Sequence, residues 1–493
     1  MSRYDVVVIG GGPAGERAAT QAARAGKRAA LVERARVVGG TCINWGAIPS
    51  KTLRESALFW REITSAPLHG IHVSPPDKLT VADFMWREKL VVSRELELVN
   101  AGLARRKVAL FQGQGQLVDA HTVAVLGSEG QSRTLLEGDY IVLATGSSPH
   151  RPEDVPFDDR CLFDSDTILQ MPRIPRSMIV LGAGVIGLEY AAMFSALGIE
   201  VTLIDTRAEL LPYLDREVVT RLEQELRKLG MIIIHDDHYA RIELDSREPT
   251  HPGLPEAPAR IPTVRCHTRQ GNVIEADVLL YSVGREGNTR DLGLERIGVT
   301  PTSRGLLEVN DRFQLASHPH IYAIGDVIGY PALASTSMEQ GRQAMRHAFD
   351  LSGPVGNTDL LPFAIYAIPE VSYIGETEEA LQEKGVPYVA GRGWYRENPR
   401  GQILGDLGGM VKLLFHQESL VLLGAHVLGT NASELIHTAQ TFLHGQATAS
   451  DVAEALYNYP TLSDLYRYAA LDALRQDRRR RSDESGEPCD EAV

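Results

Sequence analysis

Residues 4–33 read YDVVVIGGGPAGERAATQAARAGKRAALVE, and this stretch decides the fold. The β-branched run Tyr4–Ile9 is typical of a strand that is buried on both faces. A glycine-rich turn follows at residues 10–15, and the alanine-rich segment that ends at Gly26 predicts a helix. Lys27–Glu33 predicts the next strand. The stretch therefore predicts one βαβ unit of an α/β fold with a parallel sheet.

The three glycines of this turn have the GxGxxG spacing, and each has its own task. Gly10 allows the tight turn, Gly12 lets a pyrophosphate approach the backbone, and Gly15 lets the helix pack on the strand. The phosphates then lie at a helix N-terminus. Glu33 ends the second strand and is placed to accept hydrogen bonds from an adenosine ribose. Because strand, helix and acid accompany the glycines, the motif predicts a bound dinucleotide.

A second copy of the unit lies far downstream. The apolar run Ser177–Leu181 leads into Gly182, Gly184 and Gly187, which repeat the GxGxxG spacing. Glu200–Asp205 predicts the following strand and again ends in an acid. Two dinucleotides on one chain suggest a flavin and a nicotinamide, the donor and the acceptor of a hydride.

Composition and charge exclude several classes of protein. The chain has 493 residues, 43% apolar and 23% charged, as in globular proteins of about three domains. Its formal net charge of −14 argues against a nucleic-acid partner. No apolar run is long enough to span a membrane, and the N-terminal run is too short for a signal peptide. We therefore expect a cytoplasmic protein.

The four cysteines are Cys42, Cys161, Cys266 and Cys489. They lie far apart along the chain and predict neither a disulfide framework nor a metal site. A reducing compartment fits this usage best.

Two further strand ends favour a flavin. Thr145 and Gly146 follow an apolar run, and Asp326 follows the run Ile321–Ile324. Each signal is weak alone because glycine and aspartate are common where strands end. Their order after the first βαβ unit makes them more specific.

Residues 39–51, GGTCINWGAIPSK, carry the strongest resemblance. They resemble the pyridine nucleotide-disulfide oxidoreductases, flavoproteins whose motif holds two cysteines that form a redox disulfide. Cys42 matches the first of these cysteines, but Ala47 replaces the second. No dithiol can form there, so electrons cannot leave the flavin by thiol–disulfide exchange.

The C-terminal part departs from the family pattern in the same direction. Disulfide reductases of this family carry a His-Pro-Thr stretch whose histidine is the acid/base of the thiol reaction. Here residues 458–464 read NYPTLSD, and Tyr459 replaces the histidine. A phenol is a poor general base at neutral pH. The loss of the histidine together with the cysteine is consistent with lost disulfide chemistry.

Three segments place the resemblance in one branch of the class I family, the FAD-dependent, Si-specific soluble pyridine nucleotide transhydrogenases. They are residues 45–51, 325–335 and 458–471, and the resemblance covers residues 4–474. It implies an α/β fold with two Rossmann-like FAD/NAD(P)-binding domains and a C-terminal α+β dimerisation domain.

The sequence pattern and the resemblance together predict the domain limits, and the composition of the tail predicts its disorder. They are 1–150 for the first part of the FAD-binding domain, 151–276 for the NAD(P)-binding domain, 277–349 for the second part of the FAD-binding domain, 350–474 for the interface domain and 475–493 for a disordered tail. Residues 246–261, rich in proline, predict an added surface loop. The tail mixes arginines with acids and has no face to bury.

Site residues carry over from the family by position. For FAD, one per subunit, they are Gly10, Gly12, Gly15, Glu33, Arg34, Gly39, Gly40, Thr41, Cys42, Lys51, Gly113, Thr145, Gly146, Asp326 and Ala334. For NAD(P), they are Gly182, Gly184, Val185, Ile186, Gly187, Asp205, Arg207 and Gly284. The catalytic set is Lys51, Glu189, Tyr459 and Asp464, and no metal is expected.

Some of these roles have a physical reason. Lys51 and Glu189 match an ion pair beside the flavin, since a buried lysine is costly without a partner. A helix that begins near Ala334 would direct its positive end at the flavin ring. Asp205 favours the ribose hydroxyls of NAD(H), and Arg207 is suited to the extra phosphate of NADP(H).

The sequence thus predicts an enzyme that transfers a hydride between NADPH and NAD+ by a ping-pong route through FAD, without a redox disulfide. We also expect a homodimer or larger homo-oligomer, because the family builds each site from two chains. An NAD(P)H:quinone or diaphorase-type flavoprotein reductase fits the same scaffold. A non-catalytic sensor of NAD(H) that holds FAD is the alternative from another class.

Overall fold

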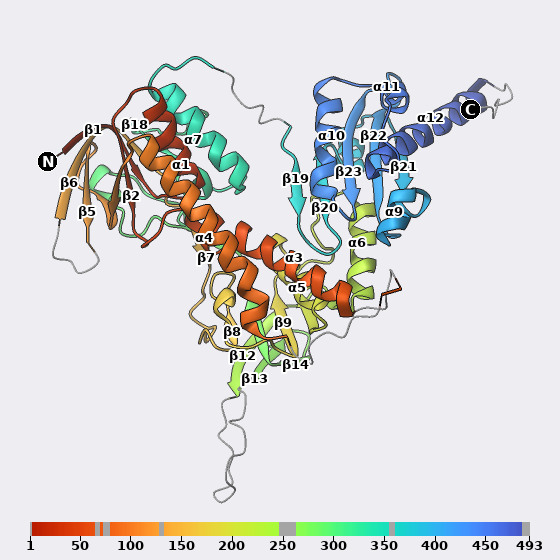
Figure 1. The fold of residues 1–493 in the computed structure, drawn as a ribbon, viewed down its shortest axis with the longest axis horizontal. Helices are drawn as coiled ribbons and strands as arrows, with labels where there is room; N and C mark the ends of the chain where they lie inside the picture. Colours follow the sequence, from red (N-terminus) through yellow and green to blue (C-terminus); the bar gives the residue numbers. More distant parts are fainter. Residues whose placement is uncertain are drawn as a thin grey trace, which may run out of the picture. The chain divides into compact units, whose positions relative to one another are not determined.

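The computed structural model describes residues 2–64, 70–71, 79–127, 133–245, 263–353 and 360–485. The chain forms two compact units, each assembled from separate segments (Figure 1). The first unit comprises Met1–Ser56, Lys78–Ile174 and Ser282–Gly356. The second comprises Ala57–Asp77, Pro175–Tyr281 and Asn357–Val493. The segment from Pro175 is therefore inserted between two segments of the first unit.

The first unit is built on an 8-stranded sheet with a mainly parallel centre. Its order is β17 (Gln314–Leu315), β18 (His318–Ala323), β6 (Arg133–Leu143), β1 (Ser2–Ile9), β2 (Ala29–Glu33) and β3 (Ala109–Gln112), with β4 (Gln114–Leu117) and β5 (Thr122–Leu126) off this path. The βαβ unit expected at residues 4–33 is confirmed, since β1 and β2 run parallel with Ile9 beside Val32. Strand β1 is buried on both faces: Val7 and Ile9 join one core, and Val6 and Val8 the other.

Helices cover one face of this sheet. Helices α1 (Pro13–Arg24) and α7 (Ala334–Ala348) lie side by side (Figure 1). Their close approach depends on Gly341, where an added Cβ would lie 2.4 Å from the carbonyl oxygen of Ala14. Helix α1 ends just before Gly26, whose φ of 76° is a left-handed conformation that glycine adopts without strain. The remaining helices that begin in this unit are α2 (Gly40–Asn44), α3 (Ala47–Thr64) and α4 (Val81–Arg105), and the second unit includes α3 from Ala57 onward.

Short elements complete the first unit. They are β7 (Ser147–Pro149), paired with β16 (Arg285–Gly287), β8 (Leu162–Phe163), and the 3-10 turns η1 (Ile168–Gln170), η2 (Leu294–Ile297) and η3 (Gly325–Ile328).

The second βαβ unit is confirmed in the second compact unit. Parallel strands pair in the order β11 (Ile232–Ile234), β10 (Glu200–Ile204), β9 (Ser177–Leu181) and β15 (Val278–Tyr281), with α5 (Val185–Ala196) after β9 and α6 (Arg216–Lys228) after β10. An antiparallel sheet of β12 (Tyr239–Asp245), β13 (Thr263–Thr268) and β14 (Val273–Ala276) follows. The surface loop expected at 246–261 falls outside the described residues.

A five-stranded antiparallel sheet forms the rest of this unit, as expected for an α+β domain. Its order is β19 (Phe363–Ile365), β20 (Val371–Gly375), β23 (Leu422–Leu428), β22 (Met410–His416) and β21 (Tyr388–Trp394). The accompanying helices and turns are α8 (Glu378–Glu383), η4 (Tyr395–Glu397), α9 (Pro399–Leu404), α10 (Ala432–His444), α11 (Ala449–Glu454), η5 (Leu462–Asp464) and α12 (Leu465–Ser485).

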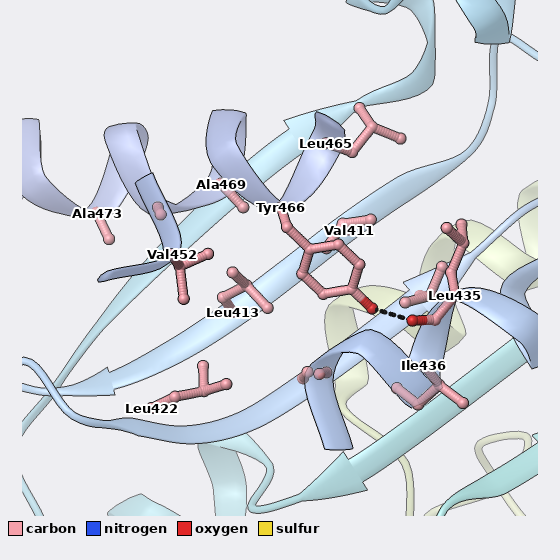
Figure 2. Packing of buried hydrophobic residues seen from close by; sticks show 14 of the residues in the cluster. Val411, Leu413, Leu422, Leu435, Ile436, Val452, Leu465, Tyr466, Ala469 and Ala473 are labelled. Atoms are coloured by element: carbon pink, nitrogen blue, oxygen red, sulfur yellow. Dashed lines mark hydrogen bonds between the residues drawn. The ribbon is translucent and has the colours of Figure 1, made fainter. Parts of the chain in front are cut away.

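One face of this sheet carries the hydrophobic core of the domain. Val411 and Leu413 of β22 lie under α12, and Tyr466 of α12 reaches α10 (Figure 2). The hydroxyl of Tyr466 donates a hydrogen bond to the carbonyl oxygen of Leu435 over 2.6 Å, so this buried phenol is satisfied.

The disorder expected from residue 475 onward is wrong for residues 475–485, which continue α12. Asp477 lies 2.8 Å from both Arg480 and Arg481, and Arg480 lies 2.8 Å from Glu484. These spacings of three and four residues place opposite charges on one side of a helix, where they stabilise it. The remaining tail residues lie outside the described part.

The fold class predicted from the sequence agrees with this architecture. In the parts of the chain that the structure describes, no helix is both long and apolar enough to cross a membrane.

Candidate functional site

The turn between β1 and α1 uses two of its glycines to hold the fold together. The Gly10 N–H donates to the Val32 carbonyl over 2.8 Å. An added Cβ would lie 2.2 Å from the Ala144 oxygen at Gly10, and 1.9 Å from the Gly10 oxygen at Gly15. Any side chain at either position would therefore displace the backbone.

The middle glycine of each motif has no such structural task. Gly12 has an ordinary φ of −74°, and within 4 Å an added Cβ would meet only the Gly40 Cα, at 3.6 Å. Gly184 has a φ of −69°, and an added Cβ would meet none of the described atoms within 4 Å. The space beside each glycine fits a pyrophosphate at the start of a helix.

Glu33 is fixed at the carboxyl end of β2. Its buried carboxylate accepts the Gly11 N–H over 2.7 Å and the Ala35 N–H over 2.8 Å. The Gly113 N–H donates to the Glu33 carbonyl over 2.8 Å, so the residue expected at the adenine lies beside the one expected at the ribose. Arg34 is exposed.

The cysteine motif lies against the same turn. The Gly39 N–H donates to the Gly11 carbonyl over 2.8 Å, and Gly40, Thr41 and Cys42 begin α2. Burial raises the pKa of the Cys42 thiol, Lys51 opposes this change, and Asp326 adds to it. The structure thus brings Cys42, Lys51 and Asp326 into one neighbourhood, with Cys42 held as a thiol.

Asp326 is the last member of a series of hydrogen-bonded polar side chains that could not be predicted from the sequence. The Ser147 hydroxyl donates to the Asp326 carboxylate over 2.9 Å, and the Arg285 guanidinium donates to the Ser147 hydroxyl over 2.8 Å. Ser147 and Arg285 are 138 residues apart in the sequence and stand in no recognisable motif. Their hydrogen bonds fix the orientation of Asp326.

Thr145 supplies a direct test of whether a ligand fits here. Its hydroxyl oxygen is buried and has no hydrogen-bond partner in the described parts of the chain. A buried hydroxyl without a partner costs free energy, so a bound polar group is expected beside it. Gly146 follows, and its carbonyl accepts the Asn288 N–H over 2.9 Å. These residues fit the FAD expected from the sequence.

Helix α7 begins at Ala334, as expected. Its N-cap is Leu333, and no side chain caps the first turn. The Gln340 side chain accepts the Gly325 N–H over 2.7 Å, which ties the helix to the turn that carries Asp326. The free N–H groups at the start of α7 favour a negatively charged ligand atom.

The second βαβ unit repeats the backbone pattern of the first. The Gly182 N–H donates to the Ile204 carbonyl over 2.9 Å, the counterpart of the bond made by Gly10. Val185, Ile186 and Gly187 form the first turn of α5. The Asp205 carboxylate, buried at the end of the strand, is paired with Arg207, with guanidinium-to-carboxylate distances of 2.5 and 3.1 Å.

Glu189, also on α5, is buried and accepts the Tyr366 N–H over 2.9 Å. This donor could not be predicted from the sequence, because it is a backbone group. Lys51 and Gly284 belong to the first compact unit. The Lys51–Glu189 ion pair and the place of Gly284 in the NAD(P) site stay predictions.

Tyr459 and Asp464 have different surroundings. Tyr459 is 73% exposed, whereas Asp464 is buried at the end of η5, with the Arg467 guanidinium 3.9 Å away. The two side chains that were expected to act together therefore differ in their exposure to solvent, and their catalytic roles stay predictions.

The cysteines are free thiols throughout the described residues: Cys42, Cys161 and Cys266. Burial, together with a hydrogen bond to Asp158, raises the pKa of Cys161 to about 12, and burial raises that of Cys266 to about 11. No group of His, Cys, Asp and Glu side chains in this part of the chain is arranged to hold a metal ion.

Comparison with known proteins agrees with this geometry. Residues 4–341 match the family model described as pyridine nucleotide-disulphide oxidoreductase, and residues 361–470 match its dimerisation domain. The chain belongs to this family. It is thus an oxidoreductase whose family uses FAD and nicotinamide nucleotides, and its dimerisation domain supports a homo-oligomer.

Similar proteins carry one recurring name. A soluble pyridine nucleotide transhydrogenase of Mycobacterium bovis (strain BCG / Pasteur 1173P2) is 43% identical over 476 residues, which are 97% of this chain and 98% of the relative. One of Pseudomonas entomophila (strain L48) is 40% identical over 476 residues, 96% of this chain and 98% of the relative.

Solved structures share the fold. LpdA from Mycobacterium tuberculosis superposes with a TM-score of 0.84 at 26% identity, covering 96% of this chain and 99% of that one. The HOCl-induced flavoprotein disulfide reductase RclA from Escherichia coli superposes with a TM-score of 0.82 at 26% identity, covering 95% of this chain and all of that one.

Proposed function

We propose that this protein is an FAD-dependent NAD(P)+ transhydrogenase that acts in a ping-pong order and uses no redox-active disulfide. The relatives named soluble pyridine nucleotide transhydrogenase support the activity. FAD held by the first βαβ turn and Glu33 would supply a ring that can accept and donate a hydride. We also propose that the protein works in the cytoplasm, with the domain limits inferred from its sequence.

The observation that carries the proposal is the missing second sulfur beside Cys42. Ala47, the first residue of α3, stands where the family has its second redox cysteine. Cys42 itself is held as a thiol, because burial raises its pKa. Cys161 and Cys266 are buried thiols with raised pKa values. A thiolate is the reactive form in disulfide exchange, so these surroundings favour a mechanism without it.

The proposed roles of the other residues concern binding and orientation. Gly12 and Gly184 leave room for the two pyrophosphates, and Glu33 accepts hydrogen bonds from the FAD ribose. Asp326, oriented by Ser147, accepts hydrogen bonds from the ribityl chain. Positioning of this kind can supply much of the rate of a hydride transfer.

Positive charge beside the reacting ring supplies the remaining part of the proposed rate of hydride transfer. Lys51, paired with Glu189, places a positive charge beside the reacting ring, and the start of α7 at Ala334 adds the positive end of a helix. Direct transfer between two rings requires no proton from a side chain. The change from histidine to Tyr459 is therefore compatible with the reaction, and we propose that the segment from Tyr459 to Asp464 reaches the flavin site of the partner subunit.

Anaerobic spectroscopy of the purified holoenzyme tests the proposal. NADPH should bleach the visible flavin absorbance, and a later addition of NAD+ should restore it within the turnover time. A quinone that restores the absorbance while NAD+ does not would indicate the quinone reductase instead. A flavin that no nicotinamide nucleotide bleaches would indicate the sensor.

Cys42→Ser tests the absence of a disulfide step. We expect the variant to retain its FAD and most of its transhydrogenase activity, because no step uses the thiol. Cys266→Ser, a buried thiol away from the motif, is the matched control. Loss of activity in Cys42→Ser with FAD still bound would refute the mechanism, as would turnover of the wild type with glutathione disulfide or lipoamide.

A further inference from the structure

One face of the five-stranded sheet carries an unusual row of side chains. The strand register places Phe363, Tyr373, His426, Lys412 and Arg392 directly beside one another, one from each strand. The aromatic members stack, with ring centroids 5.3 Å apart for Phe363 and Tyr373 and 6.2 Å apart for Tyr373 and His426. The opposite face bears the apolar core of the domain (Figure 2).

Lys412 lies at the centre of a charge cluster on this row. The residue is fully buried, and its ammonium lies 2.8 Å from Asp215, 3.1 Å from Glu217 and 3.3 Å from Glu378. Burial alone would lower the pKa of Lys412, but the three carboxylates raise it. Arg392, the next residue of the row, donates to Glu217 over 2.8 Å. The carboxylates come from α6 and α8, so the cluster joins these helices to the sheet.

Stability alone does not explain a lysine at this position. Replacing a buried ion pair by well-packed apolar residues is often neutral or stabilising. What a buried pair provides in some proteins is a single fixed arrangement of the groups that it joins. Lys412 is therefore expected to fix the position of a part of the chain that it joins to the sheet.

The position of Asp215 in the chain identifies this part. It caps α6, accepting the N–H groups of Glu217 and Val218, and it ends the segment that starts at Asp205 and Arg207. The other end of that segment is held by backbone bonds, since the Asp237 N–H donates to the Asp205 carbonyl over 3.0 Å.

The middle of the segment is also held in place. Leu210 and Leu211 are fully buried, and the Tyr213 ring lies 6.4 Å from Tyr373 of the row. The sheet thus contacts the segment at Tyr213 and at Asp215.

We propose that Lys412 is a positioning residue for the nicotinamide nucleotide, because it fixes the segment 205–215 through Asp215. The inference rests on the proposed function, since it requires Asp205 and Arg207 to contact the adenosine end of the nucleotide. It makes nucleotide binding in the NAD(P)-binding domain dependent on a side chain of the interface domain.

The test uses the oxidised holoenzyme and NADP+ in a calorimetric titration, so that no turnover is needed. The variant Lys412→Met/Asp215→Asn removes both charges of the pair and keeps an N-cap side chain. We expect it to melt near the wild-type temperature and to bind NADP+ roughly tenfold more weakly. Hydrogen exchange should rise across residues 206–214 and stay unchanged in α10, which a general loss of stability would not produce.

Two further variants complete the experiment. Lys384→Met removes an exposed lysine paired with Glu376 in the same domain, and it should bind NADP+ as the wild type does. Glu217→Gln weakens the cluster mildly and should bind NADP+ about threefold more weakly.

The outcomes test the inference about Lys412 and the proposed function separately. Wild-type affinity in the double variant, or in Glu217→Gln if the double variant does not fold, would overturn the inference. A wild-type protein that binds neither NADP+ nor NAD+ would instead refute the proposed function.

Discussion

Removing the Arg207 side chain should weaken the binding of NADP(H) much more than the binding of NAD(H). In the structure its guanidinium pairs with the buried carboxylate of Asp205, and its side chain is 38% exposed. Under the proposed function, it would contact the extra phosphate on the ribose of NADP(H). In Arg207→Ala this cation is lost and the negative charge of Asp205 remains uncompensated. The change should disfavour NADP(H), which carries the extra phosphate, and spare NAD(H).

The size of the effect follows from the type of contact. A charge-assisted hydrogen bond contributes roughly 1.5–3 kcal/mol, and tenfold in Kd corresponds to about 1.4 kcal/mol. NADP+ should therefore bind roughly tenfold to a hundredfold more weakly to Arg207→Ala. A partly exposed ion pair is worth less than about 1 kcal/mol, so the Kd of NAD+ should change by less than about fivefold.

Calorimetric titration of the oxidised holoenzyme with NADP+ and with NAD+ measures both values directly. Arg176→Ala is the matched control, because Arg176 is 85% exposed and precedes β9, at the end of the strand opposite Asp205. It should leave both affinities unchanged. An equal loss of affinity for NADP+ and NAD+ in Arg207→Ala would refute the assignment, as would no loss for either.

Three further outcomes follow from the geometry. Gly184→Ala should fold, keep its FAD and bind NAD+ at least about tenfold more weakly, as measured by calorimetry. Gly12→Ala should fold and purify with less FAD, as measured by flavin absorbance. Unchanged ligand binding in both variants would contradict the glycine roles. Iodoacetamide at neutral pH should leave Cys161 and Cys266 unmodified in the native protein, since their raised pKa values and burial keep them protonated, and peptide mass spectrometry reads the result. Sedimentation should show a dimer that Tyr459→Asp weakens, whereas a fully active monomer would exclude a site built from two chains.

The two βαβ units were predictable because their signals are local. Glycine spacing, apolar runs and a terminal acid lie within about thirty residues, and each depends on backbone geometry that few other residues allow. The observed strand Ser177–Leu181 coincides with the predicted one, and Ala334 begins the helix that was expected to start there. Membership of the family was predictable for the same reason.

Side-chain partners from distant segments were not predictable. Ser147 orients Asp326 across 179 residues of sequence, and Lys412 meets Asp215 across 197. A serine after a strand and a lysine within an apolar strand are common, so neither marks a site by itself. The helical residues 475–485 were missed for another reason: their mixed charges suggested disorder, although the spacing of those charges suits a helix.

The two acids at the ends of β2 and β10 occupy equivalent positions but are held differently. Two backbone N–H groups, those of Gly11 and Ala35, donate to Glu33, and the backbone cannot rotate away without breaking the turn. Asp205 accepts closer hydrogen bonds from the Arg207 side chain, at 2.5 and 3.1 Å, than from the Arg207 N–H, at 3.4 Å, and that side chain is 38% exposed. A rigid acid suits a cofactor that stays bound through every cycle. An acid whose partner can move suits a site that two nucleotides enter in turn, one with a phosphate on its ribose and one without. Under the proposed function, the different donors to Glu33 and Asp205 would suit the first site to a permanently bound cofactor and the second to nucleotides that exchange.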